Sequence, residues 1–209
     1  MQIVFEDSHI AIVNKTPGII SDPNHSSFEG TLTQQENPFF CVNRIDQVVS
    51  GLLLVAKNKE SAASFSSLFK DKFIEKTYLA IVEKGRAIES ENLEQKLIRN
   101  ARLKKAFVNE KGKKASLSYK KIGSTDHYDC LEIKMKEGRF HMIRCLLSHA
   151  GMPIKGDVKY GARRKNSDRS IDLHAYKLSF VHPATKESHN IIAPLRENNL
   201  WRACYEFFE

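Results

Sequence analysis

Short runs of apolar residues separated by polar breaks predict several strands in the first third of the chain. Residues 3–5 and 10–13 are mostly apolar and lie on either side of a polar Asp-Ser turn. The continuous apolar run Gly51–Ala56 has the length and composition of a buried strand. Residues 22–38 are polar, contain Pro, Asn, Ser and Gly, and predict a long loop before that strand.

Two later segments carry apolar residues at helical spacing. Residues 60–71 predict a helix, and its apolar stripe consists of Ala63, Phe65, Leu68 and Phe69. Residues 139–150 follow a glycine and predict a second helix, with core-facing positions Ile143, Leu146, Leu147 and Ala150. Both stripes are expected to face a hydrophobic core.

Strand patterns dominate the remainder of the chain. Residues 130–136 alternate between apolar and charged positions, which is typical of a strand with one buried face. Further strands are predicted at 76–82, 117–122, 171–181 and 190–193, and a terminal helix at 195–208. Many strands with a few helices predict an α+β fold with a mostly antiparallel sheet. We find no internal repeat or low-complexity linker, so a single domain is expected over residues 1–209.

The charge of the chain favours a polyanionic partner. Its 33 Lys and Arg against 25 Asp and Glu give a net charge of +8. Phosphate contacts are additive over many basic side chains because each one releases counterions. Residues 98–116 concentrate this charge and lack apolar periodicity at their centre. The stretch is interpreted either as a solvated connection between strands or as a mobile arm that grips phosphates.

The four cysteines and the N-terminus favour a cytoplasmic protein. Cys41, Cys130, Cys145 and Cys204 form no Cys-x-x-Cys pair, and free thiols in a reducing compartment are the simplest interpretation. No apolar signal-peptide core precedes residue 15, and the longest apolar run is far too short to cross a membrane. The sequence indicates no obligate protein partner, so a monomer is the default expectation.

One face of the second predicted helix carries three residue types that bind metals, but a metal site is not expected. His141, Cys145 and His149 recur every four residues within the second predicted helix. Three ligands on one straight helix span about 11 Å, which is too far for a single ion with bonds of about 2.1 Å. Nucleotide-binding glycine motifs, the zinc-protease His-Glu-x-x-His and the hydrolase Gly-x-Ser-x-Gly are absent from the sequence.

Three other segments carry residues suited to catalysis. The first is Asn43-Arg44-Ile45-Asp46, a polar turn just before the apolar run. The second is Lys76-Thr-Tyr78-Leu-Ala-Ile-Val82, and the third is Gly138-Arg139-Phe140-His141-Met142-Ile143-Arg144. Taken singly, they are interpreted as a surface turn with a local ion pair, a core strand and a capped helix start.

Together and in this order, the segments resemble the RluA-type pseudouridine synthases. The segments of that family read His-Arg-Leu-Asp-x-x-Thr-Ser-Gly, Lys-x-Tyr-x-Ala-x-Val and Gly-Arg-Thr-His-Gln-Ile-Arg. A fourth family segment, Gly-His-Pro-Ile-x-Gly-Asp-x-x-Tyr-Gly, is similar to residues 151–161. Weaker matches flank these, so that the resemblance covers residues 3–194. The chain is similar to members that lack the small N-terminal S4 domain.

Four positions depart from the motifs of the family. Asn43 stands in place of the usual His, and Val49 and Phe140 stand in place of Thr. Met142 stands in place of Gln. None of the four is the family's nucleophile or an immediate partner of it. We therefore expect the departures to affect RNA contacts and substrate choice more than chemistry.

The resemblance implies an isomerase that converts uridine in structured RNA, ribosomal or transfer, to pseudouridine without cofactor or metal. It identifies Asp46 as the nucleophilic carboxylate and Arg144 as its basic partner. Tyr78 matches the active-site tyrosine, which packs against the uracil. The resemblance also implies base flipping, because a stacked base cannot react.

Further residues are expected to bind the RNA. Arg44 matches the arginine that fills the space left by the flipped base, and Arg139 and His141 belong to the third motif and are expected to support the site. Residues 98–116 fall where the family carries an RNA-clamping loop. Asp157 and Tyr160 are interpreted as structural.

Two rival functions are compatible with the sequence. A relative that kept the fold and RNA binding but lost the reaction is suggested by the departures at Asn43, Val49 and Met142. The retention of Asp46 and its two partners argues against it. A metal-dependent hydrolase built on the histidines of the second helix is the more distant alternative.

Overall fold

A computed structural model describes residues 1–21 and 39–206 and divides the chain into two compact units. Unit 1 contains Met1–Lys76 and His174–Leu195, and unit 2 contains Thr77–Leu173 and Arg196–Glu209. The loop predicted at 22–38 lies outside the described residues, and the single domain expected over 1–209 stays a prediction. The strands and helices confirm the α+β class with mostly antiparallel pairing.

Unit 1 is built on β4 (Ser50–Ala56), whose seven residues are all buried. The strand pairs antiparallel with β2 and β3 and parallel with β10. The outer strands β1 and β11 pair antiparallel with β2 and β10. The remaining bounds are β1 Gln2–Glu6, β2 Ile10–Lys15, β3 Phe40–Cys41, β10 Leu173–Val181 and β11 Ser188–Ile192. The predicted opening strand pair and the buried strand are therefore confirmed.

Gly51 makes the parallel pairing of β4 with β10 possible. Its φ of 110° lies in a region that side chains disfavour, and an added Cβ would meet the backbone of Ala175. Ala175 is also the register partner of Gly51. A larger residue at position 51 would therefore push the two strands apart just beyond the polar turn that carries Asp46.

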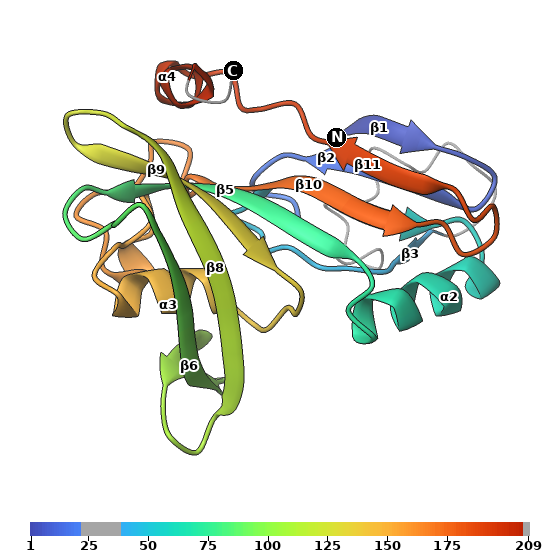
Figure 1. Ribbon diagram of the computed structural model, residues 1–209, viewed down its shortest axis with the longest axis horizontal. Coiled ribbons are helices and arrows are strands. Elements are labelled where there is room, and N and C mark those ends of the chain that lie inside the picture. The colour runs from blue at the N-terminus through green and yellow to red at the C-terminus, as the bar shows by residue number, and fades with distance from the viewer. Residues whose placement is uncertain (22–38, 207–209) are drawn as a thin grey trace. The chain divides into compact units, whose positions relative to one another are not determined.

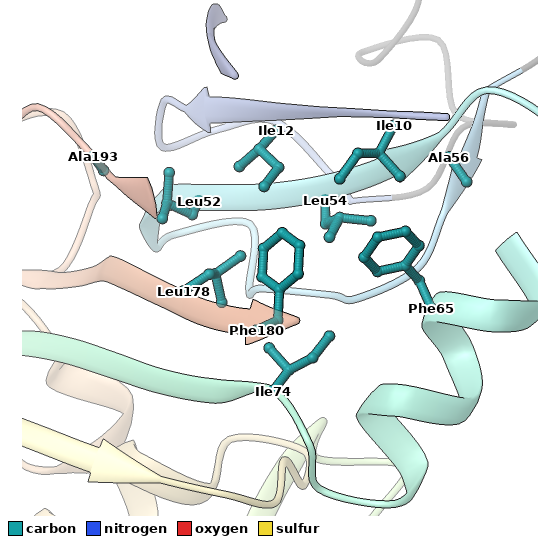
Figure 2. Packing of buried hydrophobic residues seen from close by; sticks show 10 residues of the cluster. All are labelled: Ile10, Ile12, Leu52, Leu54, Ala56, Phe65, Ile74, Leu178, Phe180 and Ala193. Atoms are coloured by element: carbon teal, nitrogen blue, oxygen red, sulfur yellow. The ribbon is translucent and has the colours of Figure 1, made fainter. Parts of the chain in front are cut away.

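Helix α2 (Lys59–Lys70) covers the hydrophobic core of unit 1. Its N-terminus is capped by Asn58, whose side-chain oxygen accepts a hydrogen bond of 2.8 Å from the amide of Ser61. Phe65 points into the cluster formed by β2, β4 and β10, as Figure 2 shows. Ala63 is exposed, so its predicted place in the apolar stripe is wrong, and Ala62 packs against the core instead.

Unit 2 is a sheet of mostly antiparallel strands, and α3 packs against β6 and β7 (Figure 1). The hydrogen-bonded strand order is β5, β9, β8, β6, β7, and the pairs β8–β9, β6–β8 and β6–β7 are antiparallel. The bounds are β5 Glu75–Glu83, β6 Ser90–Asn100, β7 Lys105–Val108, β8 Lys113–Ser124, β9 Tyr128–Met135, α3 Met142–His149, the 3-10 helix η2 Val158–Tyr160 and α4 Asn199–Tyr205.

One interpretation of the basic stretch 98–116, a solvated connection between strands, is wrong. The stretch forms the end of β6, all of β7 and the start of β8, which we call the basic ribbon (Figure 1). Ala106 and Ala115 are buried, while most of the charged residues are exposed. Small residues supply the buried face here, so the hydrophobic alternation was too weak to predict the strands.

Helix α3 begins three residues later than predicted. Arg139, Phe140 and His141 form a turn before it, and the φ of His141 is 52°, in the left-handed region that ends regular helix geometry. The predicted core positions Ile143, Leu146 and Leu147 are buried. None of the helices in the described part of the chain is long and apolar enough to cross a membrane.

The expectation of four free thiols is wrong for two cysteines. Cys130 in β9 and Cys204 in α4 form a disulfide across 74 residues of sequence. Cys41 and Cys145 are not part of a disulfide in the described part of the chain. Sequence spacing did not indicate the pair, because the two cysteines meet only when α4 packs on β8 and β9. The inference of a reducing compartment from thiols therefore rests on Cys41 and Cys145 alone.

Phe65 is the residue on which the core of unit 1 is expected to depend most. It is fully buried and makes edge-on ring contacts with Phe180 and His182. Phe65→Ala is expected to lower the free energy of unfolding by about 3–5 kcal/mol, because the cavity cannot collapse between a helix and a sheet. Urea denaturation measures the change.

Phe73→Ala provides the matched control, since Phe73 is 68% exposed. The same chemical change is expected there to leave stability within about 0.5 kcal/mol of wild type. Equal losses at the two positions would contradict the packing described for Phe65.

Candidate active site

The turn that carries Asp46 is held by the segment that follows β2. The amide of Gly18 donates to the carbonyl oxygen of Gln47 at 2.7 Å, and the Gln47 side chain donates back to the Gly18 carbonyl at 2.9 Å. The Ser21 hydroxyl donates to the carbonyl of Ile45 at 2.9 Å. Both neighbours of the half-buried Asp46 are thereby fixed from outside the turn.

Lys15 places a buried positive charge in the same unit as Asp46. Its side chain is fully buried, and its ammonium donates to the carbonyl oxygens of Thr16 at 3.0 Å and Gln47 at 3.4 Å. Burial lowers the pKa of Lys15 to about 8, and the negative charge of Asp46 opposes that decrease. Sequence analysis missed this residue as a part of the site, although it lies within residues 3–194, which the family resemblance covers.

The motif departures in unit 1 have structural roles. Asn43 accepts a hydrogen bond of 2.7 Å from the amide of Leu54 in β4, so its side chain supports the strand behind the turn. Val49 is buried. Arg44 is exposed, and its contact with RNA stays a prediction. Ser50 bonds the buried His174 ring at 2.8 Å, which links the start of β4 to β10.

In unit 2, Arg144 forms a bidentate ion pair with Asp157. Its Nε and Nη2 atoms each donate to one carboxylate oxygen at 2.7 Å. The side chains are only 6% and 1% exposed, so water does not screen the pair. The guanidinium carbon also lies 4.9 Å from the centre of the Tyr160 ring. Asp157 and Tyr160, which were interpreted as structural, therefore determine the orientation of Arg144.

Arg139 and His141 connect the turn before α3 to the basic ribbon and to Tyr160. Arg139 Nε donates to the carbonyl oxygen of Lys114 at 2.7 Å and so attaches the turn before α3 to the basic ribbon. His141 Nδ1 lies 2.9 Å from the Tyr160 hydroxyl, which accepts a bond of 2.7 Å from the amide of Ala106. Burial raises the pKa of Tyr160, so the phenol keeps its proton. The RNA-binding roles expected for Arg139 and His141 stay predictions.

The predicted site residues are distributed over both units. Arg44 and Asp46 belong to unit 1, whereas Tyr78 and Arg144 belong to unit 2. Tyr78 is half-buried near the start of β5. The joint role of Asp46, Tyr78 and Arg144 accordingly stays a prediction. Within residues 1–21 and 39–206, no three His, Cys, Asp or Glu side chains are grouped so that they could hold a metal ion.

Comparisons with known proteins identify related sequences and folds. A profile of the family described as RNA pseudouridylate synthase matches residues 9–149. The uncharacterized RNA pseudouridine synthase YjbO of Bacillus subtilis is 29% identical over 95% of this chain and 74% of that protein. The ribosomal large subunit pseudouridine synthase D of Zymomonas mobilis is 30% identical over 88% of this chain, which spans 65% of that protein's length.

Solved structures agree in fold. The human RNA Pseudouridylate Synthase Domain Containing 4 protein superposes with a TM-score of 0.80 at 19% identity, covering 99% of this chain and 92% of that one. The Domain Containing 1 protein gives 0.79 at 24% identity, covering 97% of this chain and 86% of that one. At these identities the similarity establishes the fold.

Removing the charge of Asp157 is expected to destabilise unit 2. Asp157→Asn removes the carboxylate charge that is paired with the buried Arg144, which costs about 3–5 kcal/mol of unfolding free energy. Chemical denaturation measures the loss. Glu110→Gln is the control, because its pair with Lys96 is exposed and is expected to contribute nothing measurable. Similar stability of both variants would contradict the role assigned to the buried pair.

Because the pKa of Lys15 is lowered in the folded chain, the free energy of unfolding is expected to rise with pH. The pKa of Lys15 is about 8 in the folded chain, against its usual 10.5, so between these values the unfolded chain binds more protons. Relative to Lys15→Met, wild type should gain up to about 1.4 kcal/mol per pH unit from pH 8 towards 10. Urea denaturation across this range, with the exposed Lys70→Met as control, measures it. If the difference in stability between wild type and Lys15→Met does not change with pH, the lowered pKa assigned to Lys15 is wrong.

Proposed function

The chain belongs to the RNA pseudouridylate synthase family, whose members isomerise uridine in RNA, and we propose that its substrate is one specific uridine in a structured ribosomal or transfer RNA. The family match over residues 9–149 carries the proposal, because it contains Asp46, Tyr78 and Arg144. Relatives that are named ribosomal large subunit pseudouridine synthases favour ribosomal RNA.

The reaction changes the connectivity of the nucleotide and nothing else. The bond between N1 of uracil and C1′ of ribose breaks, the base turns, and a bond forms between C5 and C1′. C5 then loses its proton and N1 gains one, so that atoms and electrons balance within the nucleotide. The protein therefore has to supply a nucleophile, a route for protons and a site that keeps the detached uracil in place.

We assign the nucleophilic role to Asp46. Its carboxylate either attacks C1′ directly or assists formation of a glycal intermediate, and both routes require the ionised form. The hydrogen bonds from Gly18 and Ser21 to its neighbours support a fixed position for this side chain. Such positioning is valuable because errors of about 1 Å in a reacting group cost roughly a hundredfold in rate.

Arg144 and Tyr78 are proposed to act with Asp46. The guanidinium of Arg144 is always protonated and suited to hydrogen-bonding a carboxylate. Its bidentate pair with Asp157 supports a fixed orientation, because the two hydrogen bonds from Nε and Nη2 hold the plane of the guanidinium. Tyr78 is proposed to pack against the uracil and to accept a proton from the sugar.

Base flipping and charge complete the proposal. The target uridine must leave its stack, which costs a few kcal/mol. The exposed Arg44 is proposed to take the vacated space, since a planar guanidinium stacks on bases and also contacts phosphates. The net charge of +8 and the basic ribbon support binding to a polyanion. Monomeric state and cytoplasmic location stay predictions.

Mapping of pseudouridine in total RNA from cells with and without the protein tests the function directly. The expected result is one modified position that disappears with the protein and returns on re-expression. The rival, an RNA-binding relative without activity, predicts unchanged maps but retained RNA binding. It is the relevant alternative because Asn43, Val49 and Met142 depart from the family motifs.

Asp46→Ala is expected to abolish pseudouridine formation while preserving fold and RNA affinity. Loss of a covalent nucleophile lowers turnover by at least about 10⁴-fold. Tritium release from RNA labelled at C5 of uridine measures turnover, and circular dichroism checks the fold. Asp126→Ala, at an exposed turn position, is the control and should retain full activity. Substantial turnover by the Asp46 variant would remove this residue from the mechanism.

A further inference from the structure

A cation and two rings form a three-layer stack at the junction of the basic ribbon and α3. The guanidinium carbon of Arg99, in β6, lies 4.5 Å from the centre of the Phe140 ring. Phe140 in turn stacks on His141 with 3.8 Å between ring centres and 17° between planes. Arg99 is the exposed outer layer, and the two rings behind it are half-buried.

The stack is anchored from below. The Tyr160 hydroxyl bonds both His141 Nδ1, at 2.9 Å, and the amide of Ala106 in β7, at 2.7 Å. Tyr160 itself is 3% exposed. The left-handed φ of 52° at His141, which is uncommon for a residue with a side chain, is maintained by these contacts. The guanidinium of Arg99 therefore rests on a support that the fold holds in place.

This arrangement suits a nucleobase better than a phosphate. A phosphate contact needs only a positive charge within reach and could be made by Lys as well as Arg. A guanidinium supported by a ring presents its outer face, which is the surface on which unpaired bases stack. Phe140 stands where the related motifs have Thr, so the ring beneath Arg99 is a departure of this chain.

The surroundings of the stack provide phosphate contacts for a single strand. Exposed basic residues of the ribbon and its turns lie along the chain next to Arg99: Arg102, Lys104, Lys111, Lys113 and Lys114. A positively charged surface combined with a stacking platform is the arrangement used for unpaired nucleic acid. A regular duplex offers no free base face and would meet only the charges.

We propose that Arg99, Phe140 and His141 form a stacking platform for an unpaired nucleobase of the RNA substrate. The platform deepens the proposed function, on which it rests, by requiring a target uridine that lies in or beside a single-stranded loop. Its anchor Tyr160 also lies against Arg144, so a base stacked on Arg99 is connected through packed rings to the proposed catalytic arginine.

Arg99→Lys tests the platform because it keeps the charge and removes the planar face. The probe is a stem-loop RNA with 2-aminopurine at one loop position at a time, whose fluorescence is quenched by stacking. Arg99→Lys is expected to weaken binding about tenfold, to abolish quenching at one position and to leave the salt dependence of the affinity unchanged. Phe140→Leu should act in the same direction.

Arg202→Lys is the matched control, since it makes the same substitution at an exposed position of α4, outside the ribbon. It should bind and quench as wild type does, and circular dichroism confirms that each variant is folded. The proposal is overturned if Arg99→Lys matches wild type, or if Arg99→Gln weakens binding only by reducing the salt slope by about one, which would indicate a phosphate contact.

The outcome separates the platform from the catalytic assignment. If wild type quenches the loop base and Arg99→Lys does not, the platform is supported even where pseudouridine assays of the same RNA give no product. If wild type forms pseudouridine but no loop position is quenched, the platform is wrong and the proposed function stands. Binding to a fully paired duplex of the same length should be insensitive to Arg99→Lys, and equal sensitivity there would overturn the proposal.

Discussion

The buried ion pair between Arg144 and Asp157 is the interaction on which the candidate chemistry of unit 2 depends. Two charges with side-chain exposures of 6% and 1% are tolerated there because two short hydrogen bonds join them. The pair joins α3 to the irregular segment after it, and Tyr160 packs on the guanidinium. An arginine held in this way keeps a fixed orientation, as its proposed role beside a reacting carboxylate requires.

In unit 1, a few hydrogen bonds hold the turn that carries Asp46. The chain leaves β2, passes Lys15, Gly18 and Ser21, and uses each of them to bind the backbone on one or other side of Asp46. Behind the turn, the close approach of Gly51 to Ala175 joins β4 to β10. The proposed nucleophile lies four residues before the fully buried strand β4, so its turn is anchored to a rigid element.

The basic ribbon connects charge to structure in unit 2. Its strands are attached to the turn before α3 by Arg139, by Tyr160 and by the stack on Phe140. RNA bound along the ribbon would consequently act on the same packed rings that orient Arg144. In the proposed function, substrate recognition and catalytic geometry would therefore share one small cluster of packed side chains.

The sequence by itself determined the α+β class, the opening strands, the buried run before α2 and the three motifs, because each is a local pattern of hydrophobicity or residue order. Only the tertiary structure decided that Lys15 lies under the Asp46 turn, that Asp157 orients Arg144 and that Cys130 pairs with Cys204. The start of α3 and the ribbon strands also escaped prediction, since a left-handed His141 and small buried alanines leave little periodic signal. Contacts between residues distant in the chain depend on how strands and helices pack, and no local pattern encodes them.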